Sequence, residues 1–265
     1  MIYKRDLVDK IWPLIDTAQA IVVTGMRRCG KTFLFQDIFA KIESKNKLFL
    51  DLENPLIQHL FEAENYETIK NSLESQGLDL AQKAWIFLDE IQWVKNLPSV
   101  VKYLSDHYQV KFFLTGSASF YLKNLFSESL SGRKFLLELW PLSFQEFLRF
   151  KKSPLILPEK AKRNLITIKM FQPLWQEYLE FGGFPGVILA KNREEKELLL
   201  NEVFTAYFQK EVRQLADFRK DDLVRDLILL LAENVGNLDN VERLATELKV
   251  SRITIEEWLA FLTDT

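Results

Sequence analysis

The segment at residues 25–32, Gly-Met-Arg-Arg-Cys-Gly-Lys-Thr, limits the folds open to this chain more than any other part of its sequence. It matches the pattern G-x-x-x-x-G-K-[ST]. An apolar, β-branched run precedes it at residues 20–24, and apolar side chains at helical spacing follow it from Phe33 to Ile42. This order of strand, glycine-containing loop and helix suits phosphate binding, because the loop amides can converge on an anion at a helix N-terminus.

Each residue type in this segment has a predicted part in binding a nucleoside triphosphate. Gly25 and Gly30 let the backbone approach the phosphates closely. Lys31 places a positive charge on the β- and γ-phosphates, and the Thr32 hydroxyl is positioned to bind Mg²⁺. A glycine turn in an unrelated sheet is the alternative. The candidate binding residues here are Gly25, Met26, Arg27, Arg28, Cys29, Gly30, Lys31, Thr32 and Phe33.

Four positions of the loop are left open by the pattern, and Arg27, Arg28 and Cys29 occupy three of them after Met26. The two arginines could contact phosphate, a second subunit or solvent, and solvent is favoured. Cys29 is expected to be a tolerated small residue. The histidines, His59 and His107, have no partner visible in the sequence and are expected to be structural or surface residues.

Further short apolar runs alternate with helical patterns along the first half of the chain, at residues 48–50, 85–88, 112–114 and 135–139. Strands that alternate with helices are typical of a parallel α/β sheet. After Pro141 the strand pattern stops, and the rest is predicted to be helical, with long segments at 194–218 and 221–234 and a Gly-Gly-Phe-Pro turn at 182–185. We expect an α/β domain at 1–150 and a helical domain at 151–235.

The last predicted domain, residues 236–265, has the spacing of a helix-turn-helix, with helices at 241–248 and 253–262 and no wing strands after them. The segment 241–262 carries four glutamates against three basic residues. Glu256 and Glu257 lie where a DNA-reading helix favours Arg, Lys or Asn. A packing role is therefore favoured over base reading, and DNA is a less favoured partner.

Two acidic residues, Asp89 and Glu90, follow the apolar run at 85–88. A strand that ends in carboxylates places them at the edge where open α/β sheets bind ligands. Asp89 is predicted to hold Mg²⁺ through water. Glu90 is predicted to orient and polarise the water that attacks the γ-phosphate, since phosphoryl transfer depends on positioning and charge stabilisation. Solvated acids at a strand end are the alternative, which the phosphate-binding loop upstream disfavours.

Two further candidates for catalysis lie around the later strands. Ser117, with Thr115 as second choice, follows the run at 112–114 and could hydrogen-bond the γ-phosphate or the attacking water, although turn capping explains a hydroxyl there equally well. Arg133 precedes the run at 135–139. It could stay on its own surface or reach the nucleotide of a neighbouring subunit as an arginine finger.

Composition excludes several classes of protein and site. With 35 basic and 37 acidic residues, no overall positive field draws the chain to nucleic acid or anionic lipid. One cysteine and two histidines are too few for a disulfide or a Cys/His zinc site. The N-terminus is charged where a signal peptide is apolar, and no apolar run is long enough for a membrane span, so a cytoplasmic protein without membrane contact is expected.

The motifs GMRRCGKT, WIFLDEIQW, FFLTGSAS, SGRKFLLELWPLSFQEF and FGGFPGVI resemble the AAA-type ATPase core of a large group of bacterial and archaeal ATP-binding proteins, related to the archaeal-ATPase and STAND branches of the P-loop NTPases. The likeness covers most of the chain. It implies a sheet of strand order 5-1-4-3-2, a helical lid and a winged helix. Members usually continue into a further C-terminal domain, whereas this chain stops at Thr265; a fragment or a natural short form would account for that.

The resemblance also implies a role for particular residues. It makes residues 25–32 the Walker A motif, Asp89 and Glu90 the Walker B motif, and Ser117 the sensor-1 position. Arg133 matches the Gly-Arg position before the fifth strand, and Pro185 matches a lid motif that approaches the nucleotide.

Together these features predict an enzyme that binds ATP with Mg²⁺ and hydrolyses it slowly, with the lid moving between nucleotide states. A homo-oligomer and a protein partner of unknown identity are expected possibilities. The alternatives are a nucleotide-gated scaffold without significant turnover and a DNA-binding regulator that uses the helix-turn-helix.

Overall fold

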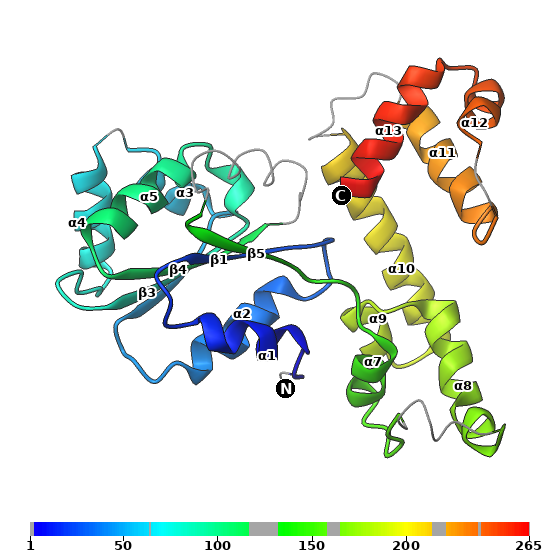
Figure 1. The fold of residues 1–265 in the computed structure, drawn as a ribbon, viewed down its shortest axis with the longest axis horizontal. Coiled ribbons are helices and arrows are strands. Elements are labelled where there is room, and N and C mark those ends of the chain that lie inside the picture. Colours follow the sequence, from blue (N-terminus) through cyan, green and yellow to red (C-terminus); the bar gives the residue numbers. More distant parts are fainter. Residues whose placement is uncertain are drawn as a thin grey trace.

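The computed structural model describes residues 3–63, 65–116, 132–157, 165–213, 221–237 and 240–264. Its first half contains a five-stranded sheet in which all the paired strands are parallel (Figure 1). The strands are β1 (Ala20–Thr24), β2 (Lys47–Asp51), β3 (Ala84–Asp89), β4 (Val110–Gly116) and β5 (Lys134–Glu138). Their order across the sheet is β2-β3-β4-β1-β5. The predicted parallel α/β fold and the order 5-1-4-3-2 are confirmed.

Helices cover both faces of this sheet, which makes a three-layer unit (Figure 1). On one face lie α1 (Leu7–Ile11), the 3₁₀ turn η1 (Trp12–Leu14) and α2 (Lys31–Lys41), and on the other lie α3 (Pro55–Phe61), α4 (Tyr66–Ser75), η2 (Ile91–Trp93) and α5 (Leu97–His107). Side chains alternate between the faces with the period of a strand: Ile86 packs into one core, and Phe87 into the other. Burial on both faces explains the continuous apolar runs.

Aromatic packing fixes α2 against the middle of the sheet. Phe87 of β3 and Phe113 of β4 stack with ring centroids 4.2 Å apart. Phe35 of α2 meets both rings edge-on, at 5.6 and 5.7 Å. The loop before α2 is therefore held in a fixed place relative to the ends of β3 and β4.

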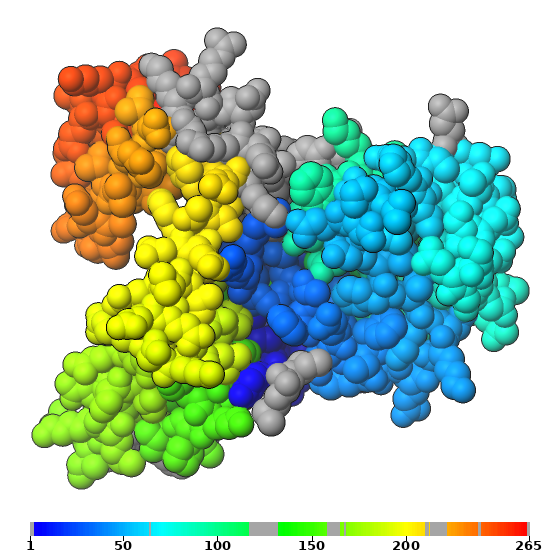
Figure 2. Space-filling model, turned by 180° about the vertical axis from the view of Figure 1, so that it is seen from behind, coloured from blue at the N-terminus to red at the C-terminus, as the bar shows by residue number. Residues whose placement is uncertain are grey.

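The regular elements that the structure describes after the sheet are all helices. The first of them are α7 (Phe144–Phe150), α8 (Leu165–Phe181), α9 (Pro185–Leu189) and α10 (Arg193–Tyr207). The predicted turn at 182–185 leads into α9, and the predicted helix at 194–218 appears as α10 followed by a π-helical segment, Phe208–Arg213; residues 214–218 lie outside the described part. Seen from behind, α10 lies against the N-terminal part of the sheet unit (Figure 2).

Three helices pack with Phe208 and Val212 of the π-helical segment into a small bundle: α11 (Asp221–Glu233), α12 (Val241–Leu248) and α13 (Arg252–Asp264). The predicted helices at 221–234, 241–248 and 253–262 are all present. Lys249, with φ +53°, makes the tight turn between α12 and α13. Within the described residues from 221 to 264 there is no strand, so a winged helix is not confirmed.

The hydrophobic packing changes soon after β5. Leu139 packs with the sheet, whereas Leu142 belongs to a different cluster together with Phe147 of α7 and Ile188 of α9. Helix α7 therefore packs with the helices that follow it, although it lies within the predicted domain 1–150. The domain boundaries at 150 and 235 stay predictions. None of the helices that the structure describes is long and apolar enough to cross a membrane.

Candidate functional site

The predicted phosphate-binding loop joins the C-terminal end of β1 to the start of α2. Gly25 has φ +142°, and a Cβ there would lie 2.2 Å from the carbonyl oxygen of Leu139, so only glycine fits under this neighbouring backbone. The first helical bond of α2 runs from Leu34 N to Gly30 O at 2.9 Å. The N–H groups of Lys31 and Thr32 precede it, in the part of a helix that presents N–H donors to an anion.

The ammonium group of Lys31 lies inside this loop. The residue is 5% exposed, and Nζ donates hydrogen bonds to the carbonyl oxygens of Gly25 at 2.7 Å and Met26 at 3.0 Å. These acceptors are neutral. A positive charge is therefore held at the mouth of the loop, as the motif predicts, where an anionic phosphate would interact with it strongly.

Asp89, at the end of β3, accepts hydrogen bonds from hydroxyl groups of two other elements. Its side chain is buried, and Oδ2 accepts a hydrogen bond from Thr32 Oγ1 at 2.6 Å. Oδ1 accepts one from Thr115 Oγ1 and another, at 3.1 Å, from Glu90 N. The two predicted Mg²⁺ ligands, Thr32 and Asp89, are thus adjacent. A carboxylate and a hydroxyl are hard oxygen donors and fit Mg²⁺, which takes few protein ligands and keeps several waters.

Glu90 directly follows Asp89, but its side chain has other partners. Its backbone is left-handed, with φ +55°, a conformation that non-glycine residues rarely adopt and that often marks functional sites. Its carboxylate accepts a hydrogen bond from Gln92 Nε2 and lies 3.9 Å from Arg27 Nη1. Glu90, Arg27, Arg28 and Ala206 of α10 line a cavity of about 270 Å³. The predicted base therefore borders open space beside the loop.

The two loop arginines have specific partners, and the expectation that solvent is their main environment is wrong for Arg27. The Arg27 side chain is only 13% exposed, beside Glu90. Arg28 is half-exposed, and its Nη1 lies 2.7 Å from Glu202 Oε2 of α10. Arg28 thus links the loop to a helix from the second half of the chain.

Cys29 is fully buried beneath the loop and packs with the sheet core. Burial raises the pKa of its thiol against the nearby positive charges of Lys31 and Arg5. The thiol is consequently neutral and acts as a small packing group, which agrees with the sequence analysis.

A second cavity, also of about 270 Å³, lies on the other side of the loop. Its lining is mainly apolar and includes both remaining candidates, Phe33 and Pro185. Tyr3, Phe150 and Leu189 also line it, and it borders Gly30, whose Cβ position is 3.6 Å from Pro185 Cγ. The N-terminus, the loop and the helical part of the chain therefore meet around one apolar space.

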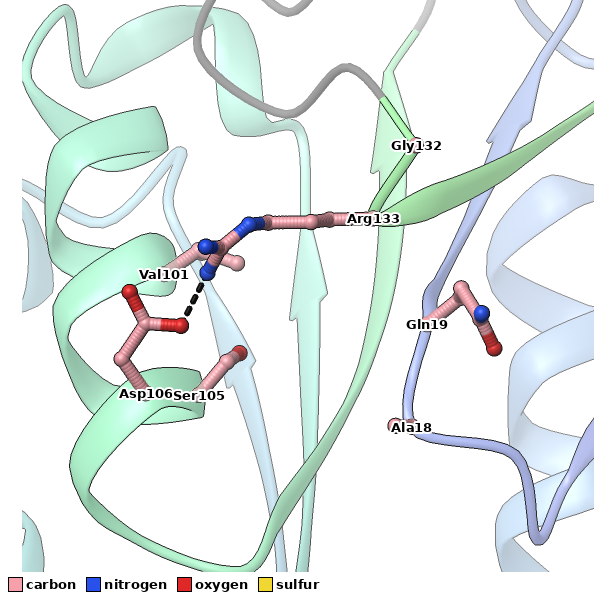
Figure 3. Close-up of a pocket in the computed structure, with 7 residues that line it drawn as sticks. All are labelled: Ala18, Gln19, Val101, Ser105, Asp106, Gly132 and Arg133. Atoms are coloured by element: carbon pink, nitrogen blue, oxygen red, sulfur yellow. Dashed lines mark hydrogen bonds and ion pairs between the residues drawn. The ribbon is translucent and has the colours of Figure 1, made fainter.

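Of the last two predicted catalytic residues, only Arg133 can be placed, and it lies away from this site. Ser117 lies outside the described residues. Arg133 lies level with the start of β1, since its carbonyl accepts a hydrogen bond from Ala20 N, whereas the loop follows the other end of β1. Its guanidinium reaches across a small cavity to Asp106 of α5 (Figure 3). Its contact with a neighbouring subunit stays a prediction.

Three residues that the sequence analysis did not single out complete the surroundings of the loop: Arg5, Gln92 and Glu202. Gln92 follows Glu90 closely, and its amide could have been suspected. Glu202 lies 174 residues from its partner, and Arg5 is one of several charged residues near the N-terminus. No spacing pattern points to either.

Comparison with known families decides the class of this fold. A family model described as an AAA domain matches residues 17–148. The chain carries an AAA domain of the P-loop ATPase type. This AAA domain contains the site from Gly25 to Thr115, while Arg5 precedes it. A second model, described as a domain of unknown function, matches residues 172–265.

Relatives of the whole chain are known from bacteria and archaea. The chain is 27% identical to an uncharacterized protein of Haemophilus influenzae, over 99% of the chain and 64% of that protein. It is also 27% identical to the uncharacterized protein MJ1544 of Methanocaldococcus jannaschii, over 99% of the chain and 58% of that protein. The chain therefore spans about three fifths of the length of these relatives.

Among solved structures, the Walker-type ATPase PABY2304 of Pyrococcus abyssi has a similar fold. The TM-score is 0.51 and the identity 16%, over 94% of this chain and 89% of that one. The likeness extends past the AAA domain into the helical part.

Proposed function

We propose that this chain binds ATP with Mg²⁺ in the loop between β1 and α2 and hydrolyses it slowly, so that the bound nucleotide acts as a conformational switch. The observation that carries the proposal is the 2.6 Å hydrogen bond from Thr32 Oγ1 to Asp89 Oδ2. It joins two residues that are 57 positions apart in sequence, next to the buried ammonium of Lys31. This is the donor set that a metal-bound triphosphate requires.

Each residue of the site has a distinct role in this proposal. The first-turn N–H groups of α2 and the Lys31 ammonium bind the phosphates. Thr32 and Asp89 would hold Mg²⁺, which neutralises charge on the phosphate oxygens when bound. Glu90 orients the attacking water from the cavity that it lines, and Thr115 holds Asp89 in place.

The apolar cavity lined by Phe33 and Pro185 would receive the base. Its aromatic and aliphatic lining suits a flat ring, and it borders Gly30, so a nucleotide with its phosphates in the loop would reach it. The guanine-recognition pattern Asn-Lys-x-Asp does not occur in the sequence, which favours adenine. Pro185 would bring the helical part of the chain into contact with the same ligand.

The switch would use α10, which contacts the loop through the Arg28–Glu202 ion pair and borders the cavity at Glu90 with Ala206. A γ-phosphate in that region would touch groups from both halves of the chain. Its loss on hydrolysis would weaken the closed arrangement, as in other nucleotide switches.

Two substitutions test the proposal. Lys31→Ala should weaken ATP binding by roughly tenfold or more, measured by titration calorimetry with Mg²⁺ present, because a charged donor to phosphate is lost. Glu90→Gln should retain ATP binding and lower phosphate release by about a hundredfold, because the general base is lost. Lys41→Ala, at the exposed far end of α2, is the control. If Lys31→Ala binds ATP with the same affinity as the control, the nucleotide site is refuted. If wild type and Glu90→Gln hydrolyse ATP at equal rates, the role of Glu90 is refuted.

A nucleotide-gated scaffold without significant turnover is the second candidate. It is favoured by the contacts of the Glu90 carboxylate with Gln92 and Arg27, because these contacts occupy oxygens that would otherwise accept a hydrogen bond from the attacking water. Phosphate release over a long incubation separates the two candidates. Release at the rate of the Lys31→Ala variant would favour the scaffold.

DNA binding is the least favoured activity. On α13 the exposed Arg252 contacts Glu256 and Glu242, so its charge is balanced within the helix pair. A recognition helix that binds DNA presents unbalanced basic or amide groups to the bases. A salt-dependent mobility shift with DNA would reverse this judgement.

A further inference from the structure

Arg5, a buried arginine from the N-terminal segment, contacts the backbone of the phosphate-binding loop. Arg5 is 5% exposed. Its Nη1 donates to the carbonyl oxygen of Cys29 at 2.6 Å, Nη2 donates to that of Trp140 at 2.6 Å, and Nε donates to Glu146 Oε1 at 2.8 Å. One planar guanidinium thus joins the loop, the segment after β5 and the first turn of α7. Neither the AAA-domain chemistry nor the proposed hydrolysis assigns it a role.

Glu146 is held as firmly as its partner. Its Oε1 also accepts a hydrogen bond from Asp6 N at 2.8 Å, and Oε2 accepts one from Ser143 N at 2.9 Å. The Ser143 hydroxyl accepts from Glu146 N in return, so the pair forms the capping box that begins α7. Burial by itself would raise the pKa of this carboxyl, but the hydrogen bonds, foremost that from Arg5, outweigh burial and hold the pKa below its ordinary value.

The same segment is joined to the turn before α9. Leu142 N donates to Gly183 O at 2.7 Å, and Leu142 O accepts from the Tyr178 hydroxyl at 2.7 Å. A Cβ on Gly183 would lie 2.6 Å from Leu142 O, so the two backbones are in direct contact. The motifs around Glu146 and Gly183 therefore form one rigid junction, and Pro185, two residues on, lines the apolar cavity together with Arg5.

We propose that Arg5 is a positioning residue that sets the shape of the phosphate-binding loop, and that Glu146 holds it in place. In a trans peptide the C=O and N–H bonds point to opposite sides, and the described chain has no cis peptide. A carbonyl of Cys29 fixed by Arg5 therefore directs the N–H of Gly30 away from the guanidinium, toward the side where the loop amides bind phosphate. This proposal rests on the proposed function, since it presumes that the loop takes phosphate.

A purely structural pair would behave differently from a positioning pair. Removing one partner of a buried ion pair leaves an unpaired charge and destabilises the whole molecule. The test therefore replaces both partners at once, as Arg5→Gln with Glu146→Gln. This change removes both charges, and a glutamine at 146 can still complete the capping box. Arg149→Gln is the matched control, because Arg149 is on the same helix and pairs at the surface with Asp6, without contacting the loop.

The chain offers a direct probe of the relevant peptide. It contains a single cysteine, so a protein labelled with ¹³C-carbonyl cysteine and ¹⁵N-glycine has one doubly labelled bond, that between Cys29 and Gly30. Its NMR signal reports the carbonyl that Arg5 contacts and the N–H that faces the ligand. Inorganic tripolyphosphate, which has no base, is the titrant.

In the wild-type chain and the Arg149→Gln control, tripolyphosphate should shift this signal. In the double variant the signal should differ before titration, and tripolyphosphate should bind about tenfold more weakly or not at all. Arg5→Lys, which keeps the charge but not the planar fork, should fall between them. If the double variant does not fold, judged by the dispersion of its glycine signals, Arg5→Lys alone decides.

The outcomes separate this proposal from the proposed function. A wild-type signal that responds to neither tripolyphosphate nor ATP would overturn the proposed function itself. If the wild-type chain responds and the double variant binds tripolyphosphate with the same affinity, the nucleotide site stands and the positioning role of Arg5 is overturned. Where only Arg5→Lys folds, the same comparison is made with that variant.

Discussion

A single buried carboxylate, Asp89, organises the residues of the site. It accepts hydrogen bonds from hydroxyls that belong to the start of α2 and the end of β4. Neither Thr32 nor Thr115 carries a charge, so neither neutralises the negative charge with which Asp89 would bind a cation. A hydroxyl that hydrogen-bonds to a metal ligand and orients it commonly affects metal affinity almost as much as the ligand itself.

Replacing Thr115 with valine therefore tests this arrangement. Thr115→Val keeps the shape of the side chain but removes its hydrogen bond to Asp89, so the Mg²⁺ concentration needed for half-maximal ATP hydrolysis should rise by about tenfold. Thr115→Ser should restore most of the loss, and Thr263→Val, on the distant α13, should change nothing. An unaltered Mg²⁺ dependence in Thr115→Val would contradict the role.

Sequence reasoning found the site residues that are close together in the chain or end neighbouring strands. Lys31 and Thr32 follow from a local motif, and Asp89 follows from its place after a buried strand. Thr115 was only a second choice, because a hydroxyl at a strand end caps a turn as readily as it holds a carboxylate. Arg5 could not be found, since its contact with Cys29 depends on how the N-terminus crosses the sheet.

Among the contacts between elements, that of the segment before α7 with the turn before α9 leaves no room for a side chain. Gly183 lies against Leu142, and a Cβ would meet two backbone atoms, at 2.6 and 2.8 Å. The backbone atoms of Leu142 cannot move aside as the end of a flexible side chain can.

Gly183→Ala should therefore lower the free energy of unfolding by about 1–3 kcal/mol, the usual cost of overpacking. Urea unfolding followed by circular dichroism measures the change. Gly186→Ala is the matched control three residues on in α9, where nothing lies within 4 Å of the Cβ position. It should be neutral or slightly stabilising, because alanine favours helices over glycine. Equal stability of the two variants would contradict the close contact.

Elements were predicted better than the contacts between them. The five strands and their order followed from short apolar runs and from the resemblance, because strands buried on both faces have a strong pattern. The division of the long helix after Arg193 was missed, since apolar spacing continues from α10 into the π-helical segment and a change of helix type leaves no clear mark in the sequence.

At the scale of the whole molecule, the position of Arg133 bears on how copies of the chain would act together. Arg133 lies at the opposite edge of the sheet from the loop of its own chain and pairs with Asp106. An arginine placed there can act on ATP only in a neighbouring copy.

If Arg133 acts in this way, the rate of ATP hydrolysis per chain should rise with protein concentration. The mass of the particle in solution, measured with a slowly hydrolysed ATP analogue, should rise over the same range of concentration. Arg133→Ala should abolish this rise and lower hydrolysis in the assembled state by about a thousandfold or more, the scale of an arginine finger, while ATP binding persists. Asp106→Ala should retain the rise, because it only frees the arginine from its ion pair. Equal losses in both variants would mean that the pair is merely structural.

The packing of the whole molecule was the least predictable level. A boundary at residue 150 was inferred from polar and proline residues, yet the hydrophobic packing changes between Leu139 and Leu142. Composition marks exposed linkers, whereas α7 is an amphipathic helix whose partner core is decided by distant residues such as Ile188.

The alignment of the strands has a practical consequence for anyone who refolds this protein. Asp89, Thr115 and Thr32 follow or end three consecutive strands, β3, β4 and β1. If β4 paired one residue out of step, Thr115 would turn to the opposite face and lose Asp89. The proposed ATP hydrolysis would then serve as a quality check on a recovered sample, since misaligned molecules would be inactive even where their helical content looked complete.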